Sequence, residues 1–179
     1  TILTNYPGIS GTNSRTVSLW FNQQMSNNTS DQWTLATYGG AGAGGGFGIF
    51  IFPGNNIGVD IGASYVSYNP TISLNQWHHI ALVYDGVSVK GYLNGVLQGT
   101  QAGAREIPPT SQNYAIGAGE TTNMGTGAYG KFNLAQFKIH NLPLSNQEIA
   151  QEYEARKNEF DYTIHSPLTN SSPTYWTIS

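Results

Sequence analysis

The sequence contains no cysteine and few charged residues. Charged types make up 9% of its 179 residues, whereas soluble domains usually carry about 25%. The lack of cysteine excludes disulfide bonds, thiolate metal sites and thiol nucleophiles. With 7 Lys or Arg against 10 Asp or Glu, the chain also lacks the clusters of cations that nucleic acids and anionic lipids require. We therefore expect no nucleic-acid partner, and we expect no membrane insertion because no apolar run approaches about 18 residues.

Neutral polar residues stand where charge is missing. The chain has 22 glycines and many Asn, Gln, Ser and Thr residues. A surface of neutral hydrogen-bonding groups is common in extracellular and capsid-like proteins, so we expect an extracellular or virion-surface location. The length fits one domain with one sizeable hydrophobic core.

Period-two patterns predict antiparallel strands from Thr16 to about His140. Residues 16–21 place apolar side chains on one face, and residues 47–52 are apolar on both faces. A turn at 53–56 joins the latter to a strand at 57–61, and further strands are expected at 63–68, 77–84 and 87–93. The dipeptides Asp85-Gly86 and Asn94-Gly95 favour type I′ hairpin turns. These signals predict an all-β sandwich built from an antiparallel meander.

One helix is predicted near the end of the chain. Ser145 and Glu148 form a capping box, and the helical pattern continues to about Asn158. We expect this helix to cover one end of the sandwich and to present Glu152 and Arg156 on a solvated face. Residues 1–159 are therefore assigned to one domain, and residues 160–179 to an extension with a last strand and a linker.

The middle of the chain carries a family resemblance. Residues 75–86, Asn-Gln-Trp-His-His-Ile-Ala-Leu-Val-Tyr-Asp-Gly, and residues 91–95, Gly-Tyr-Leu-Asn-Gly, resemble the central hairpin of LamG-like jelly-roll domains in the concanavalin A-like lectin/glucanase superfamily. Segments 16–21 and 132–149 also resemble the family's early core strand and its last strand with a short helix. Two features depart from the family: no Phe-Asp-Gly-like turn precedes Thr16, and Ala135-Gln136 replaces the usual acid of the last strand.

The resemblance implies an antiparallel β-sandwich of the concanavalin A-like jelly-roll type with one short C-terminal α-helix. It also implies a carbohydrate-binding module, and lectin-like relatives often bind Ca²⁺ at the rim of the sandwich. Calcium is a possible ligand here, although no D-x-D or D-x-N string is present and the departure at Ala135-Gln136 weakens a transferred site. His78 and His79 are neighbours on one strand, so their side chains point to opposite faces and do not chelate one ion.

We expect no catalytic residues. Glycoside hydrolysis needs two carboxylates that face each other across the bond, and the E-x-D-x-x-E string of the superfamily's glucanases is absent. The string from Gln136 to His140 is the nearest match to the lyases of the superfamily, but it lacks their usual surroundings. A glycoside hydrolase or polysaccharide lyase stays open as an alternative, because groups from separate strands can still converge.

Sugar binding needs a flat apolar face beside amide or carboxylate groups. The segment 117–129 joins two family-like strands and supplies Glu120, Asn123 and Tyr129 as the first candidates for carbohydrate contact. Trp33 and Tyr38, which both precede the glycine-rich segment 39–46, are the second choice. We thus predict a non-catalytic carbohydrate-recognition module that binds a glycan. The alternative is a structural or assembly domain of a capsid, fibre or adhesin that binds other protein subunits.

Overall fold

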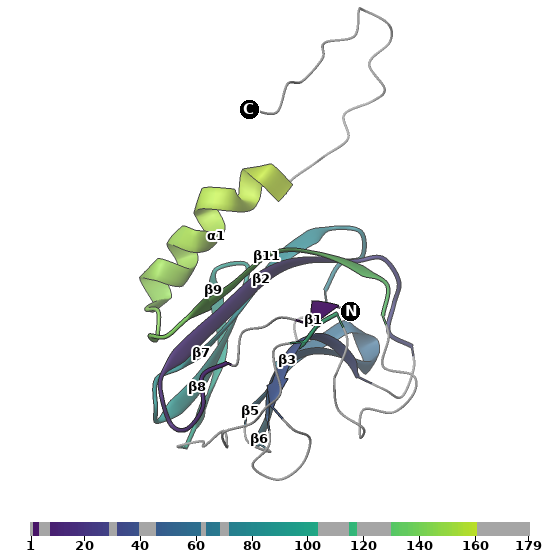
Figure 1. Cartoon of the computed structure of the whole chain (residues 1–179). Helices are drawn as coiled ribbons and strands as arrows, with labels where there is room; N and C mark the ends of the chain where they lie inside the picture. Colours follow the sequence, from purple (N-terminus) through teal and green to yellow (C-terminus); the bar gives the residue numbers. More distant parts are fainter. Residues whose placement is uncertain are drawn as a thin grey trace, which may run out of the picture.

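Antiparallel strands form most of the computed structural model, which describes residues 2–3, 8–28, 32–39, 46–61, 64–68, 72–103, 115–117 and 130–160. Two sheets face each other (Figure 1). The six-stranded sheet has the order β1 (Ile2–Leu3), β10 (Ala115–Ile116), β3 (Trp33–Gly39), β4 (Gly46–Phe52), β5 (Asn56–Ile61) and β6 (Ser64–Tyr68). The five-stranded sheet has the order β11 (Phe132–His140), β2 (Arg15–Gln23), β7 (Trp77–Tyr84), β8 (Ser88–Leu93) and β9 (Val96–Ala102). The predicted all-β sandwich is confirmed.

The core lies between the two sheets. On β2, Val17, Leu19 and Phe21 are buried in it, as the period-two pattern predicts. The opposite sheet contributes inward side chains such as Ile49 and Ile51 of β4. Burying these alternating apolar side chains fixes the register, because a slip of one residue would turn every one of them outward.

The two predicted hairpin turns have different geometries. Asn94 and Gly95 have φ angles of 50° and 78°, so both residues have the left-handed conformation that a type I′ turn needs. In the turn before β8, only Gly86 has a positive φ, 95°. There the carboxylate of Asp85 accepts hydrogen bonds from the main-chain N–H groups of Val87 and Ser88. Burial raises the pKa of Asp85, but these hydrogen bonds outweigh it and lower the pKa to about 2.

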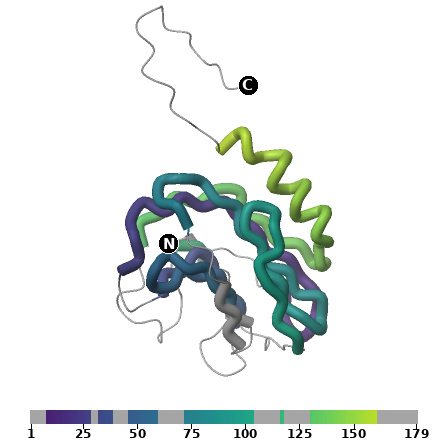
Figure 2. Tube along the Cα trace, turned by 180° about the vertical axis from the view of Figure 1, so that it is seen from behind, coloured from purple at the N-terminus to yellow at the C-terminus, as the bar shows by residue number. Residues whose placement is uncertain are grey.

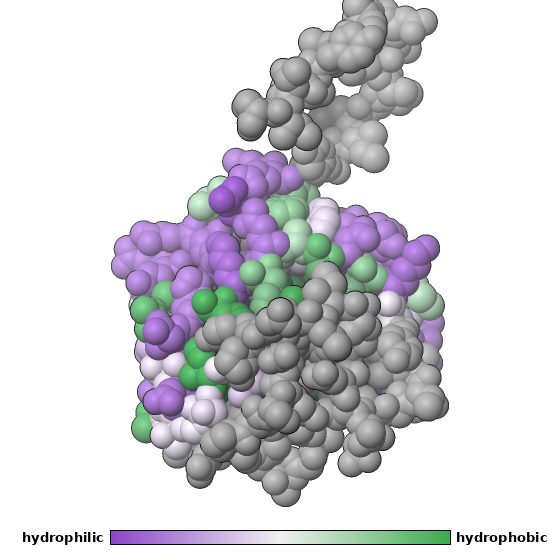
Figure 3. All heavy atoms as spheres, viewed as in Figure 1, coloured by the Kyte–Doolittle hydropathy of each residue, from purple (hydrophilic) through white to green (hydrophobic). Residues whose placement is uncertain are grey.

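Helix α1 (Asn146–Phe160) begins at the predicted capping box but lies in a different place from the one predicted. It covers the outer face of the five-stranded sheet rather than an end of the sandwich (Figures 1 and 2). Ile149 is its buried residue and packs with Ala81, Val83 and Tyr92. The other side of the helix is hydrophilic (Figure 3). In the described part of the chain, no helix is long and apolar enough to cross a membrane.

The predicted C-terminal extension lies outside the described residues beyond Phe160. The boundary between residues 159 and 160 therefore stays a prediction, although α1 continues through it.

Candidate functional site

Five connections between strands emerge at the same end of the sandwich, those that follow β2, β4, β6, β8 and β10. Antiparallel pairing puts the start of β5 beside the end of β4, the start of β9 beside the end of β8, and the starts of β7 and β11 beside the end of β2. Main-chain hydrogen bonds tie the connections together across both sheets. These bonds run from Asn75 N to Gln23 O (2.7 Å), from Gly54 N to Asn27 O (3.0 Å), and from Gln24 N to Lys131 O (2.8 Å). The described parts of the connections after β2, β4 and β6 and the residues before β11 thus lie side by side at this end.

Three asparagines define this surface. Asn55, Asn75 and Asn94 have φ angles of 62°, 58° and 50°, and each lies in a different connection. Left-handed backbone is unfavourable for most residues, but asparagine tolerates it because its short polar side chain bonds locally. We call this end of the sandwich, marked by Asn55, Asn75 and Asn94, the asparagine end.

Hydrogen-bonded amides support the asparagine end: Gln23 and Asn27 are buried, and Asn55 and Asn94 are half-buried. Asn55 Oδ1 accepts hydrogen bonds from Gln23 Nε2 (2.7 Å) and from Asn27 N (2.8 Å). Asn27 Nδ2 in turn donates to the main-chain oxygen of Ile51 (3.0 Å). Asn94 Oδ1 accepts from the main-chain N–H of His79 (2.9 Å). Loss of these hydrogen bonds would leave unpaired polar atoms beneath the turns, so the bonds stabilise the turns.

Other amides at this end face solvent. Asn28, Asn75 and Gln76 are exposed, and in the described part of the chain their side chains take part in no hydrogen bond. Trp77 follows directly and is half-buried, with its indole 4.9 Å from the ring of Phe160. Free amide groups beside a partly exposed indole are the combination that sugar rings require, since hydroxyl groups pair with amides and the C–H face packs on an aromatic ring.

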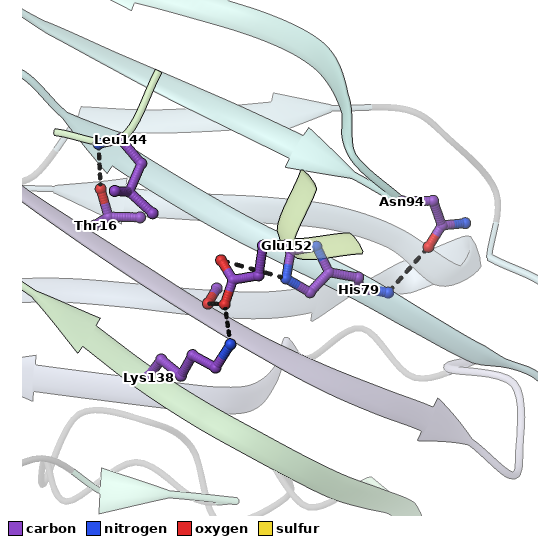
Figure 4. A network of polar contacts seen from close by, with 7 residues as sticks. Thr16, His79, Asn94, Lys138, Leu144 and Glu152 are labelled. Atoms are coloured by element: carbon purple, nitrogen blue, oxygen red, sulfur yellow. Dashed lines mark hydrogen bonds and ion pairs between the residues drawn. The ribbon is translucent and has the colours of Figure 1, made fainter. Parts of the chain in front are cut away.

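A polar cluster lies under α1, on the outer face of the five-stranded sheet (Figure 4). Glu152 of α1 accepts hydrogen bonds at Oε1 from Lys138 Nζ (2.6 Å) and Ser18 Oγ (3.0 Å). The prediction that Glu152 lies with Arg156 on a solvated face is wrong, because Glu152 turns toward the sheet while Arg156 pairs with Glu159. This cluster fastens the helix to the sheet.

His79 is the buried member of the cluster. Its side chain is 1% exposed, its Nε2 lies 4.0 Å from Glu152 Oε2, and neither ring nitrogen has a hydrogen-bond partner. Burial lowers the pKa of His79 to about 4, and the nearby Glu152 carboxylate only partly opposes this. For Glu152, burial raises the pKa, but the hydrogen bond from Lys138 and the other nearby charges leave it below its usual value.

The two neighbouring histidines point to opposite faces, as predicted. His78 lies near Phe21 on the core side, and His79 lies near Trp20 on the helix side. His78 Nε2 is 3.1 Å from the main-chain oxygen of Ser73, whereas neither ring nitrogen of His79 has a hydrogen-bond partner. Among the described residues, no group of three His, Asp or Glu side chains could hold a metal ion.

The predicted contact residues fall into two groups. Trp33 and Tyr38 are 1% and 2% exposed and belong to the hydrophobic core, so they present no ring face to a ligand. They also lie at different ends of β3, with Trp33 at the asparagine end and Tyr38 beside the glycine-rich segment. Their assignment as carbohydrate contacts is corrected: both are core aromatics, and the register shift of β3 between Thr34 and Ala36 lets side chains five residues apart face the same core.

The candidates Glu120, Asn123 and Tyr129 lie outside the described residues. The described residues that bound their segment are Gly117 and Gly130, and both lie at the asparagine end. Gly117 N donates to the main-chain oxygen of Leu35 (2.9 Å), and a Cβ on Gly130 would meet the Trp33 indole at 2.2 Å.

The carboxylates whose side chains the structure describes are engaged in local structure. Each one bonds to a cation, a hydroxyl or a main-chain N–H. They are Asp85, Glu148, Glu152, Glu154 and Glu159.

Sequence reasoning missed the exposed amides Asn28, Asn75 and Gln76. The sequence feature that could have indicated them is the position of Asn75 in the turn before Trp77 of β7. Only the topology shows that this turn lies at the same end of the sandwich as the connections after β2 and β10.

A family model described as the concanavalin A-like lectin/glucanases superfamily matches residues 2–150. The chain therefore belongs to this superfamily, and the resemblance seen in the sequence is confirmed. No match was found among curated proteins.

Solved structures share the fold at low sequence identity. The CBM40 domain of the Ruminococcus gnavus IT-sialidase, bound to α2,3-sialyllactose, is 15% identical with a TM-score of 0.65, covering 79% of this chain and 83% of that one. The receptor-binding domain of botulinum neurotoxin D is 21% identical with a TM-score of 0.62, and the match covers 86% of this chain but only 40% of that one. A SAP-like pentraxin from Limulus polyphemus is 17% identical with a TM-score of 0.56, covering 79% and 70% of the two chains.

Proposed function

We propose that this chain is a non-catalytic carbohydrate-recognition module of an extracellular or virion-surface protein, and that it binds glycan at the asparagine end. Asn28, Asn75 and Gln76 would pair with sugar hydroxyls, and Trp77 would pack against the C–H face of a ring. Glu120, Asn123 and Tyr129 belong to the same proposal, because the segment that carries them starts and ends at this surface.

The observation that carries the proposal is the set of exposed amides without partners among the described residues, on connections that hydrogen bonds stabilise. Sugar binding gains from such preorganisation because little conformational entropy is lost when the ligand arrives. The superfamily supports it, since one solved relative is a carbohydrate-binding module with a sugar bound. The local engagement of the five carboxylates whose side chains the structure describes supports a binding role over hydrolysis.

Glycan-array screening followed by titration tests the proposal. Asn75→Gly is the informative variant, because glycine accepts the left-handed backbone at φ 58° and only the amide is removed. We expect Asn75→Gly and Gln76→Ala each to weaken binding by about tenfold, the value of one good hydrogen bond. Gln101→Ala, an exposed glutamine on β9 near the opposite end, is the matched control and should bind normally.

Asn123→Ala and Tyr129→Ala test the remaining candidates, and loss of saturable binding is expected for both. Arrays that stay blank with and without calcium would overturn the proposal. So would Asn75→Gly and Gln76→Ala proteins that bind as tightly as the unmodified chain.

A second candidate function is assembly with other protein subunits, and the edge strand β9 favours it. Its sequence, Val-Leu-Gln-Gly-Thr-Gln-Ala, has no charge and no proline, the usual protections of a sheet edge. Val96 is 62% exposed and Leu97 is 39% exposed. Light scattering would show dimers or larger species that Leu97→Lys converts to monomers; a monomer at high concentration would refute this function.

A further inference from the structure

Five of the six cations that the structure describes are engaged within the fold. The sequence has 7 Lys or Arg residues, so each can be accounted for by position. Four of them form ion pairs with a carboxylate. These pairs are Lys90 with Asp85 (3.1 Å), Lys138 with Glu152 (2.6 Å), Arg156 with Glu159 (2.7 Å) and Lys157 with Glu154 (2.5 Å).

Arg15 is also engaged. Its side chain is buried, and its guanidinium donates to the main-chain oxygens of Gly11 (2.9 Å) and Asn13 (2.8 Å). It lies at the start of β2, at the opposite end of the sandwich from the asparagine end. Arginine is the residue best suited to bind a carboxylate or sulfate through two parallel hydrogen bonds, and this one is not accessible to a ligand.

Lys131 is the cation of the asparagine end among the described residues. It is exposed, and it precedes β11. The neighbouring sequence segments 29–31 and 118–129 contain Asp31 and Glu120 but no Lys or Arg. Arg105, the seventh cation, belongs to the connection after β9, which starts from the opposite end.

We infer that the asparagine end selects neutral, hydroxyl-rich glycans and gains no affinity from an acidic group such as sialate, uronate or sulfate. The inference rests on the proposed function. Amides both donate and accept, so they match hydroxyl groups, which do the same. A carboxylate or sulfate only accepts, so the accepting oxygens of the amides cannot pair with it, and among the described residues Lys131 is the cation at this end that could offset the loss of its water. One exposed lysine changes affinity for an anion by about fivefold at most, because water and salt screen the pair.

A glycan array that pairs each neutral oligosaccharide with its sialylated and sulfated forms tests the inference, run with calcium and again with EDTA. We expect at least one neutral glycan to bind, and its acidic forms to bind equally or more weakly. Affinity should change less than about twofold between 50 and 500 mM NaCl, since no counterions are exchanged. Lys131→Gln should bind the neutral glycan normally.

The outcomes separate this inference from the proposed function. Binding confined to acidic glycans would overturn the neutral selectivity and leave the carbohydrate-recognition proposal standing. A tenfold loss in Lys131→Gln or in 500 mM NaCl would overturn it in the same way. A blank array in both conditions would overturn the proposed function and the inference with it.

Discussion

The stability of the fold should fall as the pH is lowered from 7 to 4, and His79 should cause much of this fall. Its pKa is about 4 in the folded chain and 6.5 in an exposed histidine. Between these two values the unfolded chain binds a proton that the folded chain does not, so acid favours unfolding. The difference corresponds to a loss of about 3 kcal/mol at pH 4, which is a large fraction of the 5–15 kcal/mol that stabilises a typical domain.

Glu152 adds to the effect at lower pH. Its pKa is also held below the usual value in the folded chain, so Glu152 binds a proton at a lower pH in the folded chain than in the unfolded chain. The stability that Glu152 contributes is present above its unfolded pKa and is lost as the pH falls through its folded pKa. Both groups sit between α1 and the sheet, so the helix should detach in acid before the sandwich unfolds.

Urea unfolding followed at pH 7, 6, 5 and 4 measures this dependence. His79→Leu keeps an apolar side chain of similar size in the buried site and should flatten the curve between pH 6.5 and 4.5. His78→Gln, on the opposite face, should keep the greater part of the dependence. An unchanged slope in His79→Leu, or a wild-type chain equally stable at pH 7 and pH 4.5, would refute the reasoning.

Three further predictions concern packing and turns. Gly130→Ala should destabilise the fold by about 1–3 kcal/mol in urea unfolding, because the added Cβ would lie 2.2 Å from the Trp33 ring; a neutral effect would contradict the close contact. Asn94→Ala should cost about 1 kcal/mol more than Asn94→Gly, since alanine is strained at a φ of 50°, and equal stabilities would argue against that turn geometry. Phe160→Ala should speed amide hydrogen exchange in the last two turns of α1, because it removes the ring stacked 4.4 Å from Trp20; unchanged exchange would show that the stack does not hold the helix.

The sequence was most informative where structure is local. Residues 77–84 were predicted as a strand and form β7 with the same bounds. The alternation of apolar residues and the Asn94-Gly95 turn both act over a few residues, so a single sequence shows them. The capping box at Ser145 likewise locates the start of α1.

The placement of α1 and of the binding surface could not be found in this way. A capping box shows where a helix begins but not which surface it covers, and only Ile149 of α1 is buried. The bond between Glu152 and Lys138 depends on β11 lying beside β2, a pairing of strands far apart in the chain. The asparagine end likewise depends on connections that are far apart in the sequence but lie at one end of the sandwich. Trp33 was misassigned because the side chain of an aromatic residue next to a loop can point into the core or toward solvent.

The aromatic rings of α1 affect where a fragment of this protein can end. The family match stops at residue 150, while Tyr153 and Phe160, which stack on Trp20, come later in the chain. A fragment that ended at residue 150, where the family match ends, would lack both rings and would expose more of the Trp20 indole. Such a fragment would be prone to self-association, and its insolubility would say nothing about the intact chain.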